Sequence, residues 1–423
     1  MDARQQRGIE IAARFKVVRR DRDWVVPSQS ERGKKYTVSG LDVDAPRCNC
    51  PDFETRGEPC KHVFAVRVVI QRELEFDGET VRETVTVTKT IKRTYPQNWP
   101  AYNAAQTNEK DHFMVLLRDL CDGLPEPEQK RGRPRLPIRD AVFTAVMKVY
   151  TTASARRSMS DLREAHERGY ISKLPCHNSV LNALESADLA PILRSLITES
   201  SRPLKAVEAD FAVDSTGFTT CRFESWFDHK YGESAPRRQH TWVKAHVMCG
   251  VKTNVVTAIE IAGRDAHDAP QLPGLVQETA KTFAVAEVSA DKAYGSIRNA
   301  EAIANFGATP FIAFKATHTG TGTHRAGGHN SSAWTKAFGY FMYRRDEFLA
   351  HYHKRSNAES TFSMIKRKFG DSLRSKTETA QVNETLVKVL CHNLVVLIHE
   401  MYGLGIAPVF WADQSNAQEV TGS

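Results

Sequence analysis

The spacing of apolar positions changes along the chain, and these changes mark its segments. In the first hundred residues, short β-branched and aromatic runs stand between Pro and Gly residues, which is typical of strands. They predict strands at 24–26 and 36–38 and an extended segment over 84–95. Further on, apolar residues recur every three or four positions, which predicts helices. These helices are expected at 104–120, 138–151, 158–171 and 177–197.

Beyond residue 206 the two periods alternate. A strand within 208–218 has Phe211 and Val213 on one side and Asp214 on the other, before a turn expected at 216–217. The next two strands favour an antiparallel meander, and the later alternation of helices with strands favours a mixed sheet flanked by helices. The fold class is therefore α/β, in a chain that is α+β overall. The remaining elements are expected at 240–250, 254–262, 268–283, 286–290, 308–315 and 384–402.

The composition is that of a globular protein, and its charge favours some classes of partner over others. Of the 423 residues, 41% are hydrophobic and 26% charged, which is ordinary for a chain of two or three domains. No apolar run reaches the ~20 residues that span a membrane, and residues 1–15 lack the apolar core of a secretion signal. We therefore expect a cytoplasmic protein with no membrane partner. The 58 Lys and Arg residues against 50 Asp and Glu residues give a net charge of +8, which suits a polyanion.

Three of the eight cysteines form a metal-ligand pattern with a histidine. Cys48-x-Cys50 is followed after nine residues by Cys60-x-His62, and an apolar helical run begins directly afterwards. Three thiolates and one imidazole fill the four tetrahedral positions of Zn²⁺, which predicts one structural zinc ion in a small ββα module. Free buried thiols beside a surface histidine are the alternative. The other cysteines are expected to be small buried hydrophobes: Cys121, Cys176, Cys221, Cys249 and Cys391.

The C-x-C and C-x-H spacing resembles that of a SWIM-type zinc finger. This resemblance covers only the first segment of the chain. It implies a module that binds DNA or protein, with the zinc ion held by the four ligands named above.

A basic strip follows a Pro-containing linker at 123–128. Residues 130–139 include five basic residues and no acidic one. Within them, Arg131-Gly132-Arg133-Pro134 has the form of an AT-hook core, whose arginines enter an A·T-rich minor groove. A solvated basic linker is the alternative. The helices of this part fit either a helix-turn-helix-like DNA-binding bundle or a subdomain that packs against the core.

Three carboxylates stand where acidic side chains are unusual. Asp214 lies on a strand, Asp291 ends another strand, and Glu359 belongs to a basic helix. A buried Asp is costly unless it binds a metal ion or a partner. Local roles are also open: the two Asp residues as caps, and Glu359 as an i,i+4 partner of Arg355. Asp210 is the most serious rival, because it shares strand parity with Asp214.

A polar stripe is predicted around Glu359. At about 100° per residue, Tyr352, Arg355 and Lys366 lie within about 40° of it if one helix covers the whole segment. A helical stripe that faces the body of a protein is normally apolar. The polar stripe therefore indicates a functional surface.

These residues resemble the acidic triad and the Y-R-E-K signature of DDE transposases from bacterial insertion sequences. Tyr352-x2-Arg355-x3-Glu359-x6-Lys366 matches the signature at all four positions. The resemblance covers about residues 206–400 and implies an RNase H-like fold. It also implies that Arg355 and Lys366 hold DNA phosphates and that Tyr352 supports the stripe or bonds to DNA.

The same resemblance implies a catalytic role for Asp214, Asp291 and Glu359. They would hold two Mg²⁺ (or Mn²⁺) ions, since these hard cations prefer carboxylate oxygens and in-line displacement at phosphorus uses such a pair. The implied partners are double-stranded DNA, as element ends and target, and a second copy of the chain in a nucleoid-associated homodimer.

The expected organisation has four parts, and the expected activity is Mg²⁺-dependent DNA cleavage and strand transfer by a transposase that binds the ends of its element. An RNase H-like nuclease without integration activity and a zinc-containing DNA-binding regulator are the alternatives. The parts are a SWIM-like zinc-binding domain at 1–95, a linker with a helical DNA-binding region at 96–205, an RNase H-like DDE domain at 206–402 and a tail at 403–423.

Overall fold

A computed structural model gives two compact units, Met1–Pro96 and Gln97–Ser423. It describes residues 3–29, 31, 33–41, 45–74, 98–128, 135–220, 242–263, 265–315, 318, 320 and 331–411. The extended segment at 84–95, Cys221 and the AT-hook-like Arg131 and Arg133 lie outside these residues. The expectations for them stay predictions.

The first unit is an antiparallel sheet of four strands in the order β1-β2-β3-β4, with α1 and α3 packed against each other. The predicted strands are β2 and β3, in which alternate residues such as Trp24 and Val26 are buried. The expected ββα module is therefore present but larger than predicted, because α1, β1, β4 and α2 were missed. The elements are α1 (Ala3–Arg14), β1 (Val18–Arg20), β2 (Asp23–Pro27), β3 (Lys35–Ser39), β4 (Arg47–Cys48), α2 (Pro51–Arg56) and α3 (Lys61–Leu74).

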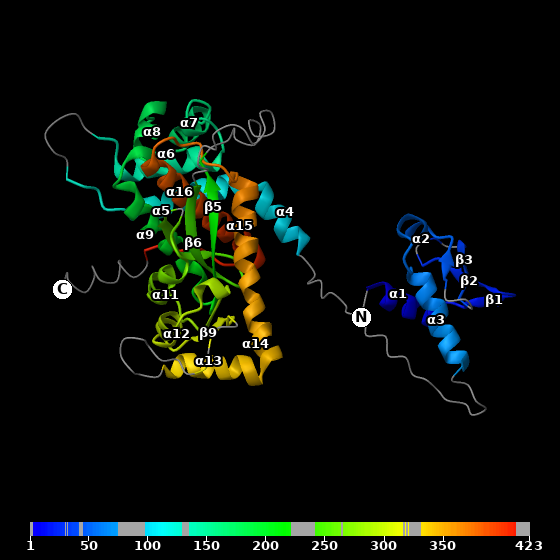
Figure 1. Cartoon of the computed structure of the whole chain (residues 1–423). Coiled ribbons are helices and arrows are strands. Elements are labelled where there is room, and N and C mark those ends of the chain that lie inside the picture. The colour runs from blue at the N-terminus through cyan, green and yellow to red at the C-terminus, as the bar shows by residue number, and fades with distance from the viewer. Residues whose placement is uncertain are drawn as a thin grey trace, which may run out of the picture. The chain divides into compact units, whose positions relative to one another are not determined.

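The second unit contains the predicted mixed sheet, with strand order β7-β6-β5-β8-β9. Figure 1 labels β5, β6 and β9 of this sheet. The first three strands form the expected antiparallel meander, and β8 and β9 continue the sheet parallel to β5. The strands are β5 (Asp210–Thr219), β6 (Trp242–Gly250), β7 (Val256–Ala262), β8 (Glu287–Ala290) and β9 (Thr309–Ile312).

Helices cover both faces of this sheet, which confirms the predicted α/β class. On one face α11 and α12 pack over Phe211 and Val213. On the other face, the helices from α4 to α9 share a single hydrophobic core with α15, α16 and residues such as Ala212. The helices of the unit are α4 (Trp99–Thr107), α5 (Glu109–Asp122), α6 (Ile138–Tyr150), α7 (Met159–Glu167), α8 (His177–Glu185), α9 (Leu189–Ser201), α11 (Leu272–Ala280), α12 (Ile297–Ala304), α13 (Ser332–Tyr343), α14 (Arg345–Tyr352), α15 (Ser356–Phe369) and α16 (Glu378–Gly403).

The longest described helix, α16, forms the centre of this core. Its 26 residues include the predicted 384–402 and contact α4, α5, α6, α8 and α9. By length and composition it alone among the described helices qualifies as a membrane span, but 72% of its apolar window is buried within the protein. That burial is typical of the core helix of a globular domain.

Several predicted elements were wrong in detail. The helix expected at 104–120 is two helices that meet at Asn108, whose side chain donates to the Ala104 carbonyl at 2.9 Å and ends α4. The helix expected at 177–197 is interrupted at Ser186, whose extended backbone (ψ 129°) ends α8. Cys176 is exposed rather than buried, because it precedes α8 at the surface, whereas Cys121, Cys249 and Cys391 are buried as predicted.

Candidate functional site

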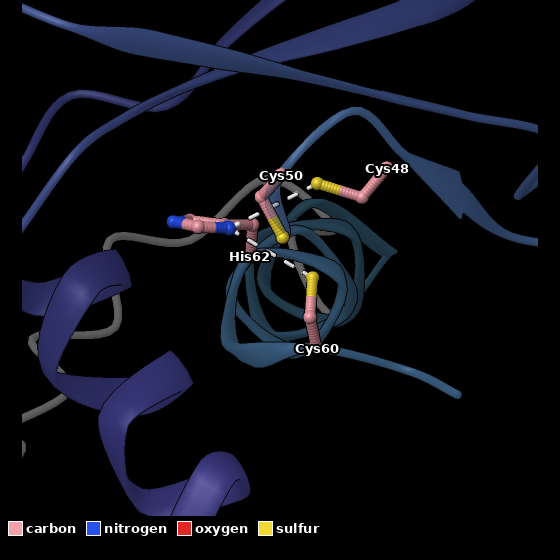
Figure 2. A group of neighbouring side chains, drawn as sticks. All are labelled: Cys48, Cys50, Cys60 and His62. Atoms are coloured by element: carbon pink, nitrogen blue, oxygen red, sulfur yellow. Dashed lines mark hydrogen bonds between the residues drawn. The ribbon is translucent and has the colours of Figure 1, made fainter. Parts of the chain in front are cut away.

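The four predicted zinc ligands come together inside the first unit. Cys48 ends β4, Cys50 is the N-cap residue of α2, and Cys60 and His62 flank the first residue of α3. Each of the four is at most 5% exposed, and one ligand atom from each lies within 4.8 Å of all the others. Figure 2 shows the three sulfur atoms and the imidazole pointing toward one another.

The donor geometry fits a zinc ion. His62 Nδ1 lies 3.8 Å from Sγ of both Cys48 and Cys60, while tetrahedral Zn–S and Zn–N bonds would place sulfur and nitrogen about 3.6 Å apart. The hydrogen bond from Cys48 lowers the pKa of Cys60 to about 3, and the same contact raises the pKa of Cys48. Thiolate is thus already favoured at one sulfur. Among the described residues, no other group of three or more His, Cys, Asp or Glu residues has ligand atoms this close.

The register of the second sheet places two of the predicted carboxylates side by side. Val213 pairs with Ala290 across the parallel strands β5 and β8, so Asp214 and Asp291 are the next residues on neighbouring strands. At this point β8 ends. Asp291 then caps the 3-10 turn η4 (Lys292–Tyr294), and its Oδ2 accepts from the Ala293 N–H at 3.4 Å.

Asp214 does not end its strand, contrary to the prediction of a turn at 216–217. β5 continues to Thr219 and pairs with β6 throughout, with Gly217 opposite Lys244. A Cβ atom at Gly217 would lie 3.2 Å from Cδ1 of Trp242, so the glycine makes room for that ring within a continuous strand. Asp214 therefore lies where the parallel neighbour ends while the antiparallel neighbour continues.

Glu359 lies on α15, which packs against β5 and β6 on the same face of the sheet as Asp214 (Figure 1). The polar stripe does not lie on one α-helix, as it would have to for the predicted angles. The 3-10 turn η5 (His353–Arg355) separates α14 from α15 and changes the helical phase, because such a turn has about three residues. Tyr352 and Glu359 consequently belong to different helices.

The stripe residues nonetheless contact the carboxylates. The Tyr352 hydroxyl donates to Asp291 Oδ1 at 3.5 Å, and Arg355 pairs with Glu359 at 3.0 Å. The Arg355 guanidinium also lies 5.4 Å from the centre of the Tyr352 ring. Lys366 donates to Thr216 Oγ1 at 2.7 Å, two residues beyond Asp214.

Electrostatics link the three carboxylates. Burial raises the pKa of Asp214, and the negative charges of Glu359 and Asp291 raise it further. The Ser215 N–H, 2.8 Å from Asp214 Oδ1, and the charge of Arg355 act in the opposite direction. The charges of Glu359 and Asp291 therefore act on Asp214, although the three carboxylates are not packed as closely as the zinc ligands. The Glu359 side chain is 57% exposed, so the cluster opens to solvent.

The rival carboxylate Asp210 already has a partner. Its Oδ2 accepts from Lys354 Nζ at 2.8 Å, and the same ammonium pairs with Glu287. Glu287 also lies 2.6 Å from Nδ1 of His351. This ion-pair network joins the first residues of β5 and β8 to the segment before α15. Sequence analysis missed Lys354, since no local pattern reveals partners that are 144 and 67 residues away.

A second polar group lies beneath Asp214 on the opposite face of the sheet, and it too was missed. His246, opposite Ser215 on β6, is fully buried, and its Nδ1 lies 3.0 Å from the Tyr294 hydroxyl. Burial lowers the pKa of His246 to about 4, so the imidazole is neutral at pH 7. This contact attaches the turn after Asp291 to the sheet.

Comparisons with known proteins agree with both regions. Residues 206–394 match the family described as the transposase DDE domain, and residues 36–66 match the SWIM zinc finger. No curated protein matches the chain. A cryo-EM structure of piggyBac transposase in a synaptic complex with hairpin DNA aligns over 76% of this chain and 78% of its own, with 11% identity and a TM-score of 0.33, which is too low to support a conclusion. The family matches show that this chain carries a transposase DDE domain preceded by a SWIM zinc finger.

Proposed function

We propose that this protein is a transposase whose second unit cleaves DNA and transfers the resulting 3′ ends in a Mg²⁺-dependent reaction. The observation that carries the proposal is the strand register, which places Asp214 and Asp291 at adjacent positions on parallel strands. Glu359 faces the same end of the sheet from α15, and its charge acts on Asp214. Positions 77 and 145 residues from Asp214 in sequence are thus combined into one carboxylate cluster.

The donor set suits a hard divalent cation. Carboxylate oxygens are the ligands that Mg²⁺ prefers, and a bound cation would offset the negative charges of Glu359 and Asp291 that act on Asp214. Bound there, Mg²⁺ would activate the attacking oxygen and stabilise the leaving oxygen at phosphorus. Asp214, Asp291 and Glu359 would hold it, and the exposure of Glu359 leaves the cluster open to a DNA strand.

The neighbouring polar residues would position the substrate and the carboxylates. Tyr352 holds Asp291 through its hydroxyl, and Arg355 holds Glu359 through its guanidinium. Arg355 pairs with Glu359, and Lys366 donates to Thr216 two residues beyond Asp214. We assign the DNA phosphates to these two cationic side chains. Burial lowers the pKa of Lys366, and a bound phosphate would favour its charged form.

The other partners belong to the same proposal. The SWIM zinc finger and the basic strip with Arg131 and Arg133 would contact the element ends or the target DNA. A homodimer would hold two ends together. A steep fall of DNA affinity with salt is expected from the phosphate contacts.

The test is Asp291→Asn, which keeps an oxygen to accept from the Ala293 N–H but removes the charge. Mg²⁺-dependent nicking of a supercoiled plasmid should fall roughly a thousandfold, or about 4 kcal/mol of activation free energy, with DNA affinity unchanged. Asp346→Asn, on the exposed N-terminus of α14, is the matched control and should cleave normally.

Other outcomes would point elsewhere. Near-normal cleavage by Asp291→Asn would refute the triad. Cleavage by the wild type without strand joining would indicate a nuclease that does not integrate. DNA binding without any metal-dependent cleavage would indicate a regulator.

A further inference from the structure

A small basic pocket lies between α6, α16 and the segment that follows α15, and α6 packs beside α16 (Figure 1). It is an open hollow, and its empty volume of about 200 Å³ includes open solvent. Its polar lining contains three cations and one carboxylate. The lining includes Lys148, Thr152, Phe369, Arg374, Glu384 and Lys388.

Two of the charged groups, Lys388 and Glu384, already have hydrogen-bond partners in the backbone. Lys388 donates to the carbonyls of Gly370 and Ser372 at 2.9 and 2.8 Å. The Glu384 oxygens accept from the backbone N–H groups of Arg374 and Ser375, at distances from 2.8 to 3.1 Å, and lie 4.0 Å from Lys388. The carboxylate is therefore engaged by backbone donors and compensated by one lysine.

Lys148 differs from Lys388 and Glu384 in that its side chain has no such partner among the described residues. It is 6% exposed, and its ammonium group has no hydrogen bond or ion pair to any residue that the structure describes. Burial lowers its pKa, and the charge of Glu384 offsets only part of this effect. A largely buried ammonium group without a partner is unfavourable, and an anion bound beside it would stabilise its charged form. Lys148 lies on a helix whose other buried residues are mostly apolar, so a charge there needs a compensating anion.

The pocket adjoins the carboxylate cluster. Lys388 Nζ lies 5.4 Å from the centre of the Phe218 ring, and Lys366 Nζ lies 5.5 Å from the same centre. Phe218 is four residues beyond Asp214 on β5, and the next residue, Thr219, bridges to Ser372 beside the pocket. The pocket and the carboxylate cluster are therefore joined through the last residues of β5.

We propose that this pocket binds one phosphodiester group of a DNA strand that passes the carboxylate cluster, with Lys148 and Arg374 as its contacts. The proposal rests on the proposed function, because the strand is the substrate of that site. The Arg374 guanidinium donates to the Thr152 carbonyl, which holds it at the pocket. A largely buried ammonium group beside this guanidinium suits the negative charge and oxygen acceptors of a phosphate. A free phosphate ion has the same chemistry, and the experiment separates the two sources.

The test is Lys148→Met in the full chain, which keeps the shape of the side chain and removes its charge. Binding of a fluorescein-labelled duplex of arbitrary fixed sequence is measured over a range of salt concentrations, without added Mg²⁺, so that cleavage plays no part. We expect an affinity about fivefold lower and a salt dependence shallower by about one counterion. The melting temperature should stay the same or rise, because an unpaired buried charge has been removed.

The matched control is Lys281→Met, which removes the exposed lysine directly after α11 on the opposite face of the sheet and should leave the affinity and its salt dependence unchanged. Equal affinity and equal salt dependence in Lys148→Met and wild type would overturn the proposal. So would a rise in melting temperature with inorganic phosphate that Lys148→Met abolishes while DNA affinity stays normal, which would assign the pocket to the free ion. Failure of wild type to bind DNA would instead refute the proposed function.

Discussion

The zinc centre and the carboxylate cluster assemble their side chains in opposite ways. The zinc ligands come from 15 consecutive residues, are almost fully buried, and have donor atoms within 4.8 Å of one another. The three carboxylates come from a span of 146 residues and meet only because β5, β8 and α15 pack together. One of them, Glu359, is 57% exposed.

Under the proposed function, this difference is the one expected between a metal that completes a fold and a metal that serves a reaction. A closed set of four soft ligands leaves no position for water and contributes its binding energy to folding. An open cluster of like charges instead reduces the stability of its own domain until a cation or substrate arrives. Changes in the two regions should therefore have effects of opposite sign on stability, which the following predictions examine.

The largest effect is expected from Cys60→Ser. Structural zinc contributes on the order of 10 kcal/mol to the folding of small modules, so loss of one thiolate should release the metal and unfold the first unit. Metal analysis should find one zinc per chain in wild type and none in the variant. Circular dichroism should show loss of the first unit's structure, while the second unit still melts at its normal temperature.

Cys176→Ser is the control, since that cysteine is exposed and lies in the other unit. It should retain a full complement of zinc. If Cys60→Ser also kept its zinc, the ligand assignment would be wrong, and the contrast between the two regions would no longer hold.

A smaller effect of opposite sign is expected from Asp214→Asn. Burial and the neighbouring carboxylates raise the pKa of Asp214, so its charged form destabilises the fold. Replacement should raise the free energy of unfolding of the second unit by about 1 kcal/mol at pH 7, as is usual when a strained functional site is relieved. Mg²⁺ should raise the melting temperature of the wild type more than that of the variant, while cleavage is abolished.

The pH dependence of stability tests the sign of this effect independently. Because the pKa is higher in the folded state, this group favours folding when it is protonated, and that contribution is lost as the pH rises through the folded pKa. The advantage of Asp214→Asn should therefore appear above this pKa and vanish in acid. Asp210→Asn, on the same face of the same strand but paired with Lys354, should instead destabilise the domain. Equal signs for the two variants would refute the argument.

The difference between local and distant side chains also determines how much of each site can be predicted from the sequence. The zinc ligands are local, so their spacing alone predicts the set that the structure brings together. The mixed sheet could also be predicted, because each strand carries its own apolar pattern. Strand parity placed Asp214 on the correct face, since side chains alternate along a strand. The position of Asp214 within β5 was wrong, because continuation past Gly217 depends on the fit of Trp242 from the next strand.

Interactions between distant segments had no signal in the sequence. Lys354 looks like one more basic residue beside Arg355, and its pairing with Asp210 appears only after η5 packs on β5. The 3-10 turn is itself a tertiary effect, because helical spacing alone predicted one uninterrupted stripe from Tyr352 onward. Secondary structure propensity therefore predicts which elements form, whereas their packing determines which side chains meet.

The smallest effect is expected from Tyr352→Phe, which separates positioning from stability. The hydroxyl makes a long 3.5 Å hydrogen bond to Asp291, and the ring lies under Arg355, which the substitution leaves in place. Stability should change by less than about 0.5 kcal/mol, since a long, partly exposed hydrogen bond contributes little.

Tyr340→Phe is the matched control, because it removes a similar bond to Glu347 at 3.4 Å. If Tyr352 positions the carboxylate, only Tyr352→Phe should slow Mg²⁺-dependent nicking, by about fivefold, because a misplaced metal ligand weakens catalysis without unfolding the domain. Equal nicking rates in the two variants would show that Asp291 is held by its strand and its cap alone, and that the carboxylate cluster, like the zinc centre, is fixed by its own backbone.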